Sequence, residues 1–442
     1  MKTPWELLKE SKTKIKTTWR IAFVSALVLG LLIHLPVMLS DIPNHDGLSS
    51  MYFDQNMITS GRWFLTVACG FSSYFTIPWV IGLIGLIWLA LTAAVLTEVL
   101  ELTDPVTITV VSGLLVSFPA LASTFAYVFT MDGYMLALFL AVLAVLFTAK
   151  YPRGYLAGAV CLAFSMGIYQ AYLPFTILLC VYKILLYFME EKGWKEKAKY
   201  VCHYLGMGIA GGVLYYVILQ ILLKLQGKVL DTYQGINSME QMGSGMGILA
   251  TIKGMYVDFL AFTVHGNVLV NNIFSLAACI ILVATVVFLV IRSMIWRKWW
   301  KNPAFFVIMI LLGISMPLLT NVILLISPNL TYHLLMRYQW VLYLILMTAF
   351  ADRYTAEESR TDVVLQWAAL CAAVVLVFDY GISDNIGYSN LEKKYEKTYA
   401  YCVRLLDRIE QTPGYYQGIP IALVGVIGYD EFPTTCLLYT SD

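Results

Sequence analysis

The sequence has 442 residues, of which 60% are hydrophobic and 13% are charged, and its mean hydropathy is +0.74. Soluble domains carry about 25% charged residues, and a soluble chain this apolar lacks the polar groups to cover its surface. The 29 basic and 28 acidic side chains nearly cancel, so net charge gives no attraction to nucleic acid. The composition excludes a soluble enzyme, a disordered chain and a nucleic-acid binder, and it indicates a polytopic helical membrane protein.

Eleven stretches are apolar enough to be interpreted as transmembrane helices, since one crossing takes about 20 residues. They are residues 21–40, 77–96, 106–125, 131–149, 155–169, 172–189, 203–224, 273–291, 304–327, 338–351 and 363–380. We therefore expect an all-α polytopic bundle of about eleven transmembrane helices.

The distribution of Lys and Arg predicts the orientation of the bundle. With the N-terminus inside, the inner segments hold 18 of these residues and the outer loops before residue 380 hold four. Positive residues concentrate on the cytoplasmic side of membrane proteins. We expect a cytoplasmic amphipathic lead-in over 1–20, a transmembrane domain over 21–380 with outer loops at 41–62 and 225–272, and an extracytoplasmic segment over 381–442.

The segment after residue 380 is less apolar than the spans. Apolar residues recur at helical spacing from Tyr388 to Ile409, which predicts one amphipathic helix that ends before Pro413. Residues 419–427 have the pattern of a buried strand. We expect a small α/β tail that docks on the outer loops, unless the chain is truncated here, because one helix and one strand are too little for an independent core.

Polar side chains gather in the loops predicted to lie outside. The first outer loop places Asp41, His45 and Asp46 within six residues, and Arg62 follows in the same loop. No span carries an ionisable residue near its centre except His34, which argues against a midplane channel. The sequence therefore predicts a site on the outer face. The other polar residues expected there are Asp132, Tyr169, Gln170, His333 and Arg337.

An outward site has no access to cytosolic nucleotide sugars, so an activated substrate must reach it attached to a lipid. A sugar on a polyprenyl phosphate fits this requirement. Its transfer needs one carboxylate as general base for the acceptor hydroxyl, and a cation for the departing phosphate, for which arginine has suitable geometry. Direct displacement with one base implies inversion at the sugar carbon. We expect Asp46 to supply the base, and Arg62 or Arg337 to contact the phosphate.

An ordered set of motifs resembles the GT-C glycosyltransferases and, within them, the bacterial and phage glucosyltransferase II family. The resemblance covers nearly the whole chain and implies a multi-pass protein of the bacterial plasma membrane. It also implies transfer of a hexose, glucose above all, from a polyprenyl phosphate to a cell-surface glycan. The motifs are Pro43-Asn44-His45-Asp46-Gly47, Gly61-Arg62-Trp63, Phe118 to Phe125 ahead of Asp132, Tyr169 to Pro174, Met336-Arg337-Tyr338, Arg408-Ile409-Glu410, Pro413-Gly414-Tyr415 and Pro420-Ile421-Ala422.

Many relatives have two adjacent acids in the first outer loop, whereas here His45 precedes the single Asp46. Three candidates for the base therefore stay open: Asp46, Asp41 and Asp132. No metal-ligand spacing links the histidines to Asp46, so no cofactor is expected, and a divalent metal has no support in the sequence. The candidate substrate-binding residues are His45, Arg62, Tyr169, Gln170, His333 and Arg337.

Two other functions compete with glycosyl transfer. A flippase or transporter for lipid-linked sugars needs polar residues through the midplane and often shows internal repeats, and the sequence has neither. A polymerase or ligase for surface polysaccharide shares the outward site and the lipid-linked substrate, so composition does not separate it from a transferase. The ordered motifs favour the transferase. Each of these candidate functions implies membrane lipids as partners.

Overall fold

The computed structural model describes residues 2–40, 55–70, 76–190, 192–231, 247–296, 298, 303–355, 359–422 and 424. Apart from one bridge between Met57 and Arg62, the regular structure of this part is helical. The first elements are α1 (Pro4–Lys14), α2 (Thr17–Leu39), η1 (Ile58–Ser60), α4 (Leu65–Ala68), α5 (Pro78–Leu100), α6 (Pro105–Ser117), α7 (Pro119–Ala126), η2 (Val128–Thr130), α8 (Met131–Lys150), α9 (Gly154–Ile168), η3 (Gln170–Tyr172) and α10 (Leu173–Met189). The others are α11 (Trp194–Gln226), α12 (Ile248–His265), α13 (Ile273–Trp296), α14 (Pro303–Thr320), α15 (Val322–Ile326), η7 (Leu334–Trp340), α16 (Val341–Tyr354) and α17 (Arg360–Glu410).

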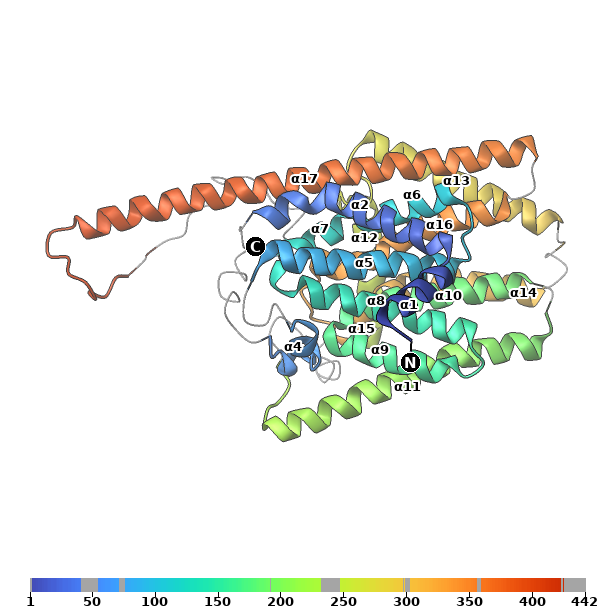
Figure 1. The fold of residues 1–442 in the computed structure, drawn as a ribbon, viewed down its shortest axis with the longest axis horizontal. Helices are drawn as coiled ribbons and strands as arrows, with labels where there is room; N and C mark the ends of the chain where they lie inside the picture. Colours follow the sequence, from blue (N-terminus) through green and yellow to red (C-terminus); the bar gives the residue numbers. More distant parts are fainter. Residues whose placement is uncertain are drawn as a thin grey trace.

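Most of the long helices run alongside one another and form one bundle (Figure 1). Helix α8 packs against α5 and α9, α2 packs against α5 and α6, and α17 packs against α6 and α13. Small residues let some of these helices approach closely, as is common between transmembrane helices. A Cβ atom added at Gly82 of α5 would lie only 2.7 Å from Met38 Cγ of α2.

Nine of the described helices are long and apolar enough to cross a membrane, or ten if α6 and α7 form one bent span. Each of the eleven apolar stretches coincides, to within about a residue at its ends, with part of one of these helices, with a pair of consecutive helices such as α14 and α15, or with the shorter apolar helix α9. The expectation of an all-α polytopic protein is therefore confirmed. The count of eleven stays a prediction, because α9 and the apolar part of α14 are shorter than the other candidates.

The stretch predicted as one span over 106–125 is bent in the structure. Helices α6 and α7 meet at an angle of 46°. Phe118 adopts an extended conformation, with φ −68° and ψ 129°, directly before Pro119. Proline disfavours a helical conformation in the residue before it, and this accounts for the break.

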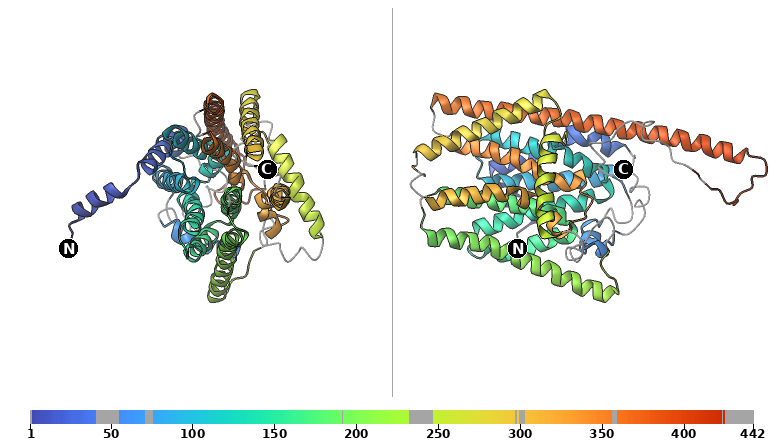
Figure 2. Two further views of the ribbon diagram at one scale, coloured as in Figure 1. Left: turned by 90° about the vertical axis from the view of Figure 1, so that its right-hand side faces the viewer. Right: turned by 180° about the vertical axis from the view of Figure 1, so that it is seen from behind.

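An additional apolar helix, α12, lies within the stretch predicted as the second large outer loop. Its 18 residues pass the same length and composition test as the other candidate spans. In the two views of Figure 2, however, α12 runs across the direction of the bundle rather than along it. Helix α12 therefore differs from the other candidates in orientation.

Helix α17 joins the last predicted span and the predicted tail helix into one helix of 51 residues. Tyr388 and Leu391 are still buried, but the part beyond them projects past the bundle (Figure 1). Tyr399 there is 63% exposed, so this part of the tail is not docked as we expected. The helix ends at Glu410, close to the predicted position. Residues 419–422 and 424 are not in a strand, and the other four residues of the predicted strand lie outside the described residues.

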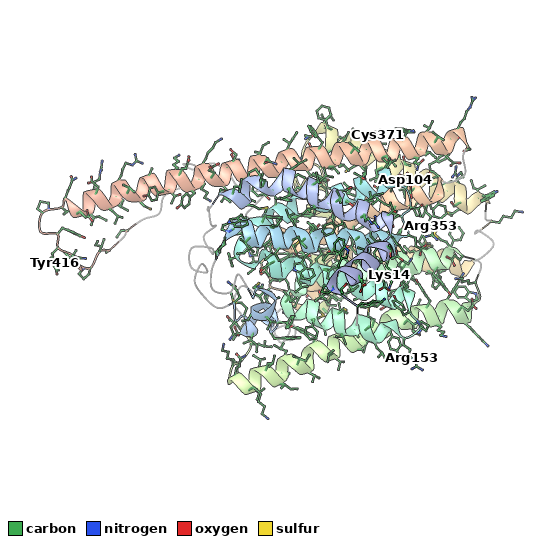
Figure 3. All side chains as sticks on the ribbon, in the orientation of Figure 1. Lys14, Asp104, Arg153, Arg353, Cys371 and Tyr416 are labelled. Atoms are coloured by element: carbon green, nitrogen blue, oxygen red, sulfur yellow. The ribbon has the colours of Figure 1, made fainter. Side chains whose placement is uncertain are left out.

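Charged groups gather at the two ends of the bundle. Lys16 Nζ lies 2.7 Å from Glu98 Oε2, and Lys183 Nζ lies 2.6 Å from Glu101 Oε1. Figure 3 shows Arg353, another partner of Glu101, toward the same end, far from Tyr416 beyond the opposite end. Every ion pair found in the described part joins two residues that the predicted topology puts at the same end. The contacts thus agree with the predicted alternation, while the direction across the membrane stays a prediction.

Labelling of cysteines tests that direction. In a variant that keeps only Cys402, which is exposed on α17, we expect a membrane-impermeant maleimide to react in intact cells. A single cysteine placed instead at the exposed Lys195 of α11 should react only after lysis. The reverse pattern would show that the N-terminus lies outside.

Candidate active site

Six of the nine candidate site residues lie in the part of the chain that the structure describes. Asp41, His45 and Asp46 lie outside the described residues. The described candidates are Asp132, Arg62, Tyr169, Gln170, His333 and Arg337.

A tight turn presents Arg62 at the predicted outer end. Met57 and Arg62 pair as an antiparallel bridge around η1, and the Arg62 amide donates to Met57 O at 3.1 Å. Gly61 has a φ of +81°, a left-handed conformation that favours glycine. The Phe64 amide donates to Gly167 O at 2.7 Å, which ties this segment to α9. We call the segment from Met57 to Phe64 the arginine turn.

The Arg62 side chain lies against two stacked tyrosines. Its Nη1 donates to Tyr134 Oη at 3.0 Å, and its guanidinium carbon lies 4.8 Å from the centre of the Tyr169 ring. The centres of the two tyrosine rings are 4.2 Å apart. Within the described part, Arg62 Nε and Tyr169 Oη are buried without a hydrogen-bond partner. An unsatisfied buried polar group costs about 1–3 kcal/mol, so the pair favours a polar ligand at this place.

Gln170 and Tyr215 hold the arginine turn from the side. Gln170 Nε2 lies 3.1 Å from Ser60 O and 3.0 Å from Tyr215 Oη, and it donates to both. Tyr215 Oη in turn donates to Gly61 O at 3.0 Å. Gln170 is a predicted substrate-binding residue, and its amide nitrogen is thus occupied within the protein.

A cavity of about 430 Å³ opens beside the arginine turn. Arg62, Tyr169 and Gln170 form a polar part of its wall together with Ser60 and Tyr215. Most of the remaining wall is apolar and comes from α11, from α15 and from the segments next to α15. These apolar side chains include Leu219, Leu230, Ile323, Ile326, Leu330 and Met336. The cavity thus combines a cation and hydroxyl groups with an apolar side, which suits an amphiphilic ligand.

Asp132 lies in the first turn of α8, two residues before Tyr134. It is only 2% exposed, and its Oδ1 accepts a hydrogen bond from the Gly133 amide at 2.9 Å. A Cβ atom added at Gly133 would lie 2.5 Å from Cys69 Sγ, so the segment after α4 covers this start of α8. Asp132 is therefore close in sequence and in space to a partner of Arg62, but it is not part of the cavity wall.

Arg337 has a different environment from Arg62. Its Nη1 and Nη2 donate to the two carboxylate oxygens of Asp258 on α12, each at 2.7 Å. Its guanidinium carbon also lies 4.0 Å from the centre of the Tyr332 ring. Among the described residues Arg62 has no such ion pair. Arg62 is therefore the better candidate for a phosphate contact, and Arg337 holds α12 in place. His333 is buried just before η7.

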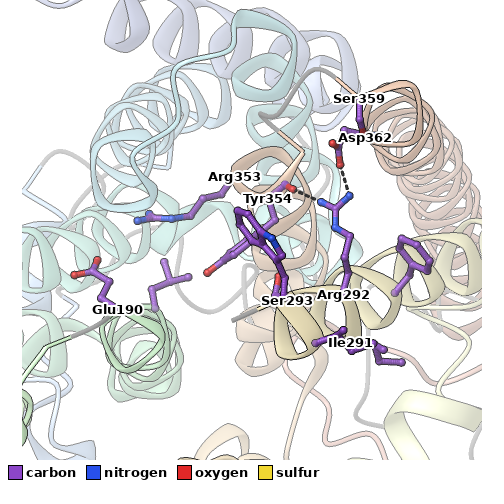
Figure 4. A pocket seen from close by; sticks show the side chains of 12 residues that line it. Glu190, Ile291, Arg292, Ser293, Arg353, Tyr354, Ser359 and Asp362 are labelled. Atoms are coloured by element: carbon purple, nitrogen blue, oxygen red, sulfur yellow. Dashed lines mark hydrogen bonds and ion pairs between the residues drawn. The ribbon is translucent and has the colours of Figure 1, made fainter. Parts of the chain in front are cut away.

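The other end of the bundle contains a larger cavity, of about 750 Å³ (Figure 4). Arg292 in its wall pairs with Asp362 at 2.5 Å and donates to Tyr354 O at 2.7 Å. Its charge is thus balanced inside the protein. This cavity also lies at the predicted inner end, away from all the predicted site residues, so size alone does not identify the active site.

Sequence reasoning missed three residues of the outer end: Tyr134, Tyr215 and Asp258. Tyr134 lies two residues after the candidate Asp132, and this nearness is the only signal that the sequence gave for it. Tyr215 lies inside an apolar predicted span, and Asp258 lies in a long loop, so neither revealed its partner. The described part contains no cluster of three His, Cys, Asp or Glu side chains that could hold a metal ion, and no residue is assigned to one.

The fold and the cavity define a polytopic helical membrane protein with a cavity at one end whose lining suits an amphiphilic ligand. The model of the glucosyl transferase GtrII family matches residues 35–351, which is most of the chain. The chain therefore belongs to this family, as the ordered motifs predicted, and membership supports glycosyl transfer with glucose. The match includes the first outer loop and the arginine turn and ends before α17. No curated protein and no solved structure matches the chain.

Replacement of Asp258 by Asn tests the structural role of Arg337. The change removes a charged partner from a mostly buried arginine, so we expect the free energy of unfolding to fall by about 1.5–3 kcal/mol. Thermal or denaturant unfolding of the purified protein in detergent measures this loss. In the Asp258→Asn background, Arg337→Gln should lower the free energy of unfolding only slightly further. Lys253→Gln, which changes an exposed residue of α12, is the control and should leave the free energy of unfolding nearly unchanged. Fully additive losses would contradict the pairing.

Proposed function

We propose that the protein is an inverting glucosyltransferase of the bacterial plasma membrane, active on the outer face. It moves glucose from a polyprenyl phosphate to a glycan of the cell surface. The single observation that carries the proposal is the cavity in which Arg62, with no ion pair among the described residues, faces an otherwise largely apolar wall. A lipid phosphate carrying a sugar has the same division between a charged group and an apolar chain.

The phosphate of the donor is assigned to Arg62. Arginine and phosphate form charge-assisted hydrogen bonds, and the buried, unpartnered Nε of Arg62 is a donor for one of them. The charge on the phosphate rises as the bond to the sugar breaks. A fixed cation at this place therefore stabilises the transition state more than the bound donor, and this difference accelerates transfer.

The isoprenoid chain is assigned to the apolar wall beside α11. This helix lies at the edge of the bundle, where Val213, Val217 and Ile221 are exposed on its outer face (Figure 1). Tyr215 and Leu219 of the same helix line the cavity. A lipid chain can therefore reach the cavity from the surrounding membrane without passing through the packed core.

The acceptor hydroxyl needs one general base, and Asp46, Asp41 and Asp132 are the candidates. The base takes the hydroxyl proton while the hydroxyl oxygen bonds to the anomeric carbon. The bond between this carbon and the phosphate oxygen breaks at the same time, and the polyprenyl phosphate leaves with the electron pair. Attack from the side opposite the leaving group inverts the anomeric carbon. Asp46 is preferred because it belongs to the motif from Pro43 to Gly47 in the same outer loop as Arg62, whereas Asp41 directly follows the end of the first predicted span.

Replacement of Asp46 by Asn tests the base. In membranes given polyprenyl phosphate with labelled glucose and cell-envelope acceptor, we expect the variant to transfer label at least about a hundredfold more slowly than the wild type. Asp407→Asn, which changes an exposed acid on α17, serves as the matched control and should keep activity. Full activity in Asp46→Asn would move the base to Asp41 or Asp132. Failure of the wild type to transfer label would contradict the proposed function.

Replacement of Arg62 by Gln tests the phosphate contact. Loss of one charge-assisted contact predicts a fall of about ten- to a hundredfold in kcat/KM for the lipid donor. The same assay over a range of donor concentrations gives this value. Arg153→Gln, at the opposite end of the bundle, is the control (Figure 3). An unchanged kcat/KM in Arg62→Gln would remove Arg62 from the site.

A further inference from the structure

We infer that Tyr215 is a positioning residue for the transfer reaction. It holds the arginine turn so that Arg62 meets the phosphate of the donor. The inference rests on the proposed function, and it assigns a role to a residue that neither the motifs nor the candidate list contains.

Hydrogen bonds from side chains hold the backbone at Gly61, directly before Arg62. Tyr215 Oη donates to Gly61 O at 3.0 Å, while Gln170 Nε2 donates to Ser60 O at 3.1 Å. Gln170 Nε2 also donates to Tyr215 Oη at 3.0 Å, which links the two contacts. Two successive carbonyl groups ahead of Arg62 are therefore fixed by side chains from α11 and η3.

The two side chains also lie very close to Gly61. A Cβ atom added at Gly61 would lie 2.5 Å from Gln170 Nε2 and 2.6 Å from Tyr215 Oη. A side chain at Gly61 would therefore displace both of these groups, and the left-handed φ of Gly61 disfavours a side chain there in any case.

Apolar packing joins the arginine turn to α11. Ile58 of the arginine turn forms a small apolar cluster with Leu219 and Leu223 of α11, separate from the main core, and Tyr215 packs against it. Elsewhere α11 is mostly exposed along the edge of the bundle. The contact with the arginine turn therefore depends on a few side chains of this helix, and Tyr215 supplies its hydrogen bond.

The hydroxyl of Tyr215 is engaged within the protein and has no proton left to donate to the phosphate of the donor. Its one proton goes to Gly61 O, and one of its two acceptor positions receives the Gln170 amide. The role of Tyr215 is consequently to position Arg62 and not to contact the reacting atoms.

The test combines Tyr215→Phe with Arg62→Gln. The phenylalanine keeps the ring and removes only the hydroxyl, so we expect kcat/KM for the lipid donor to fall about five- to tenfold. In the Arg62→Gln background the same change should have almost no further effect, because the group that it positions is gone. An equal loss in both backgrounds would show that Tyr215 acts independently of Arg62, and no loss in either would overturn the inference.

Tyr200→Phe is the matched control. Tyr200 lies on the same helix, and its hydroxyl is 3.0 Å from Tyr204 Oη at the opposite end of the bundle. This variant should leave transfer unchanged. If wild-type protein transfers glucose and Arg62→Gln impairs transfer, a silent Tyr215→Phe contradicts only the positioning role.

Hydrogen exchange gives a readout that does not depend on activity. The amides of the arginine turn should exchange faster in Tyr215→Phe than in the wild type and in Tyr200→Phe, because the Gly61 carbonyl loses its partner. Unchanged exchange of a peptide over 55–64 would overturn the inference even if the protein transferred no glucose at all.

Discussion

Hydrocarbon offers a charged side chain no hydrogen-bond partner, so charges in a transmembrane bundle need partners at its ends or within the protein. Glu98 forms ion pairs with both Lys16 and Lys150 at one end, and Asp258 accepts hydrogen bonds from Nη1 and Nη2 of Arg337 at the other. These pairs join segments far apart in sequence. They fix which loops meet at each end of the bundle. The arrangement of the candidate active site depends on which loops meet at its end.

Two arginines at the predicted outer end show how their surroundings decide their roles. Arg337 is paired with Asp258 and packed on Tyr332, so its charge is balanced before any substrate arrives. Arg62 lies on Tyr169 beside a cavity and has no ion pair among the described residues. An anionic ligand gains more from the unbalanced cation. The same comparison sets aside the larger cavity at the other end, where Arg292 is paired with Asp362.

The helices could be predicted from sequence because apolar stretches, and the prolines at which helices begin or bend, are local signals. Pro78 and Pro105 occupy the first positions of α5 and α6, and Pro119 marks the bend after α6. The site could be predicted only in outline. The bonds of Tyr215 to Gly61 and Gln170 join three separate segments, and no spacing along the chain reveals them. The continuity of α17 was missed because its two halves differ in polarity, although no proline lies between them.

The central claim is that the cavity beside the arginine turn holds the lipid-linked donor. Photocrosslinking with a polyprenyl phosphate glucose that carries a diazirine in its isoprenoid chain tests it most directly. The account predicts labelled peptides from α11 around Tyr216 and Leu219 and from the segment between Ile323 and Leu330, all on the cavity wall. Labelling confined to α13 around Phe288 and Trp296, in the cavity at the opposite end, would contradict it.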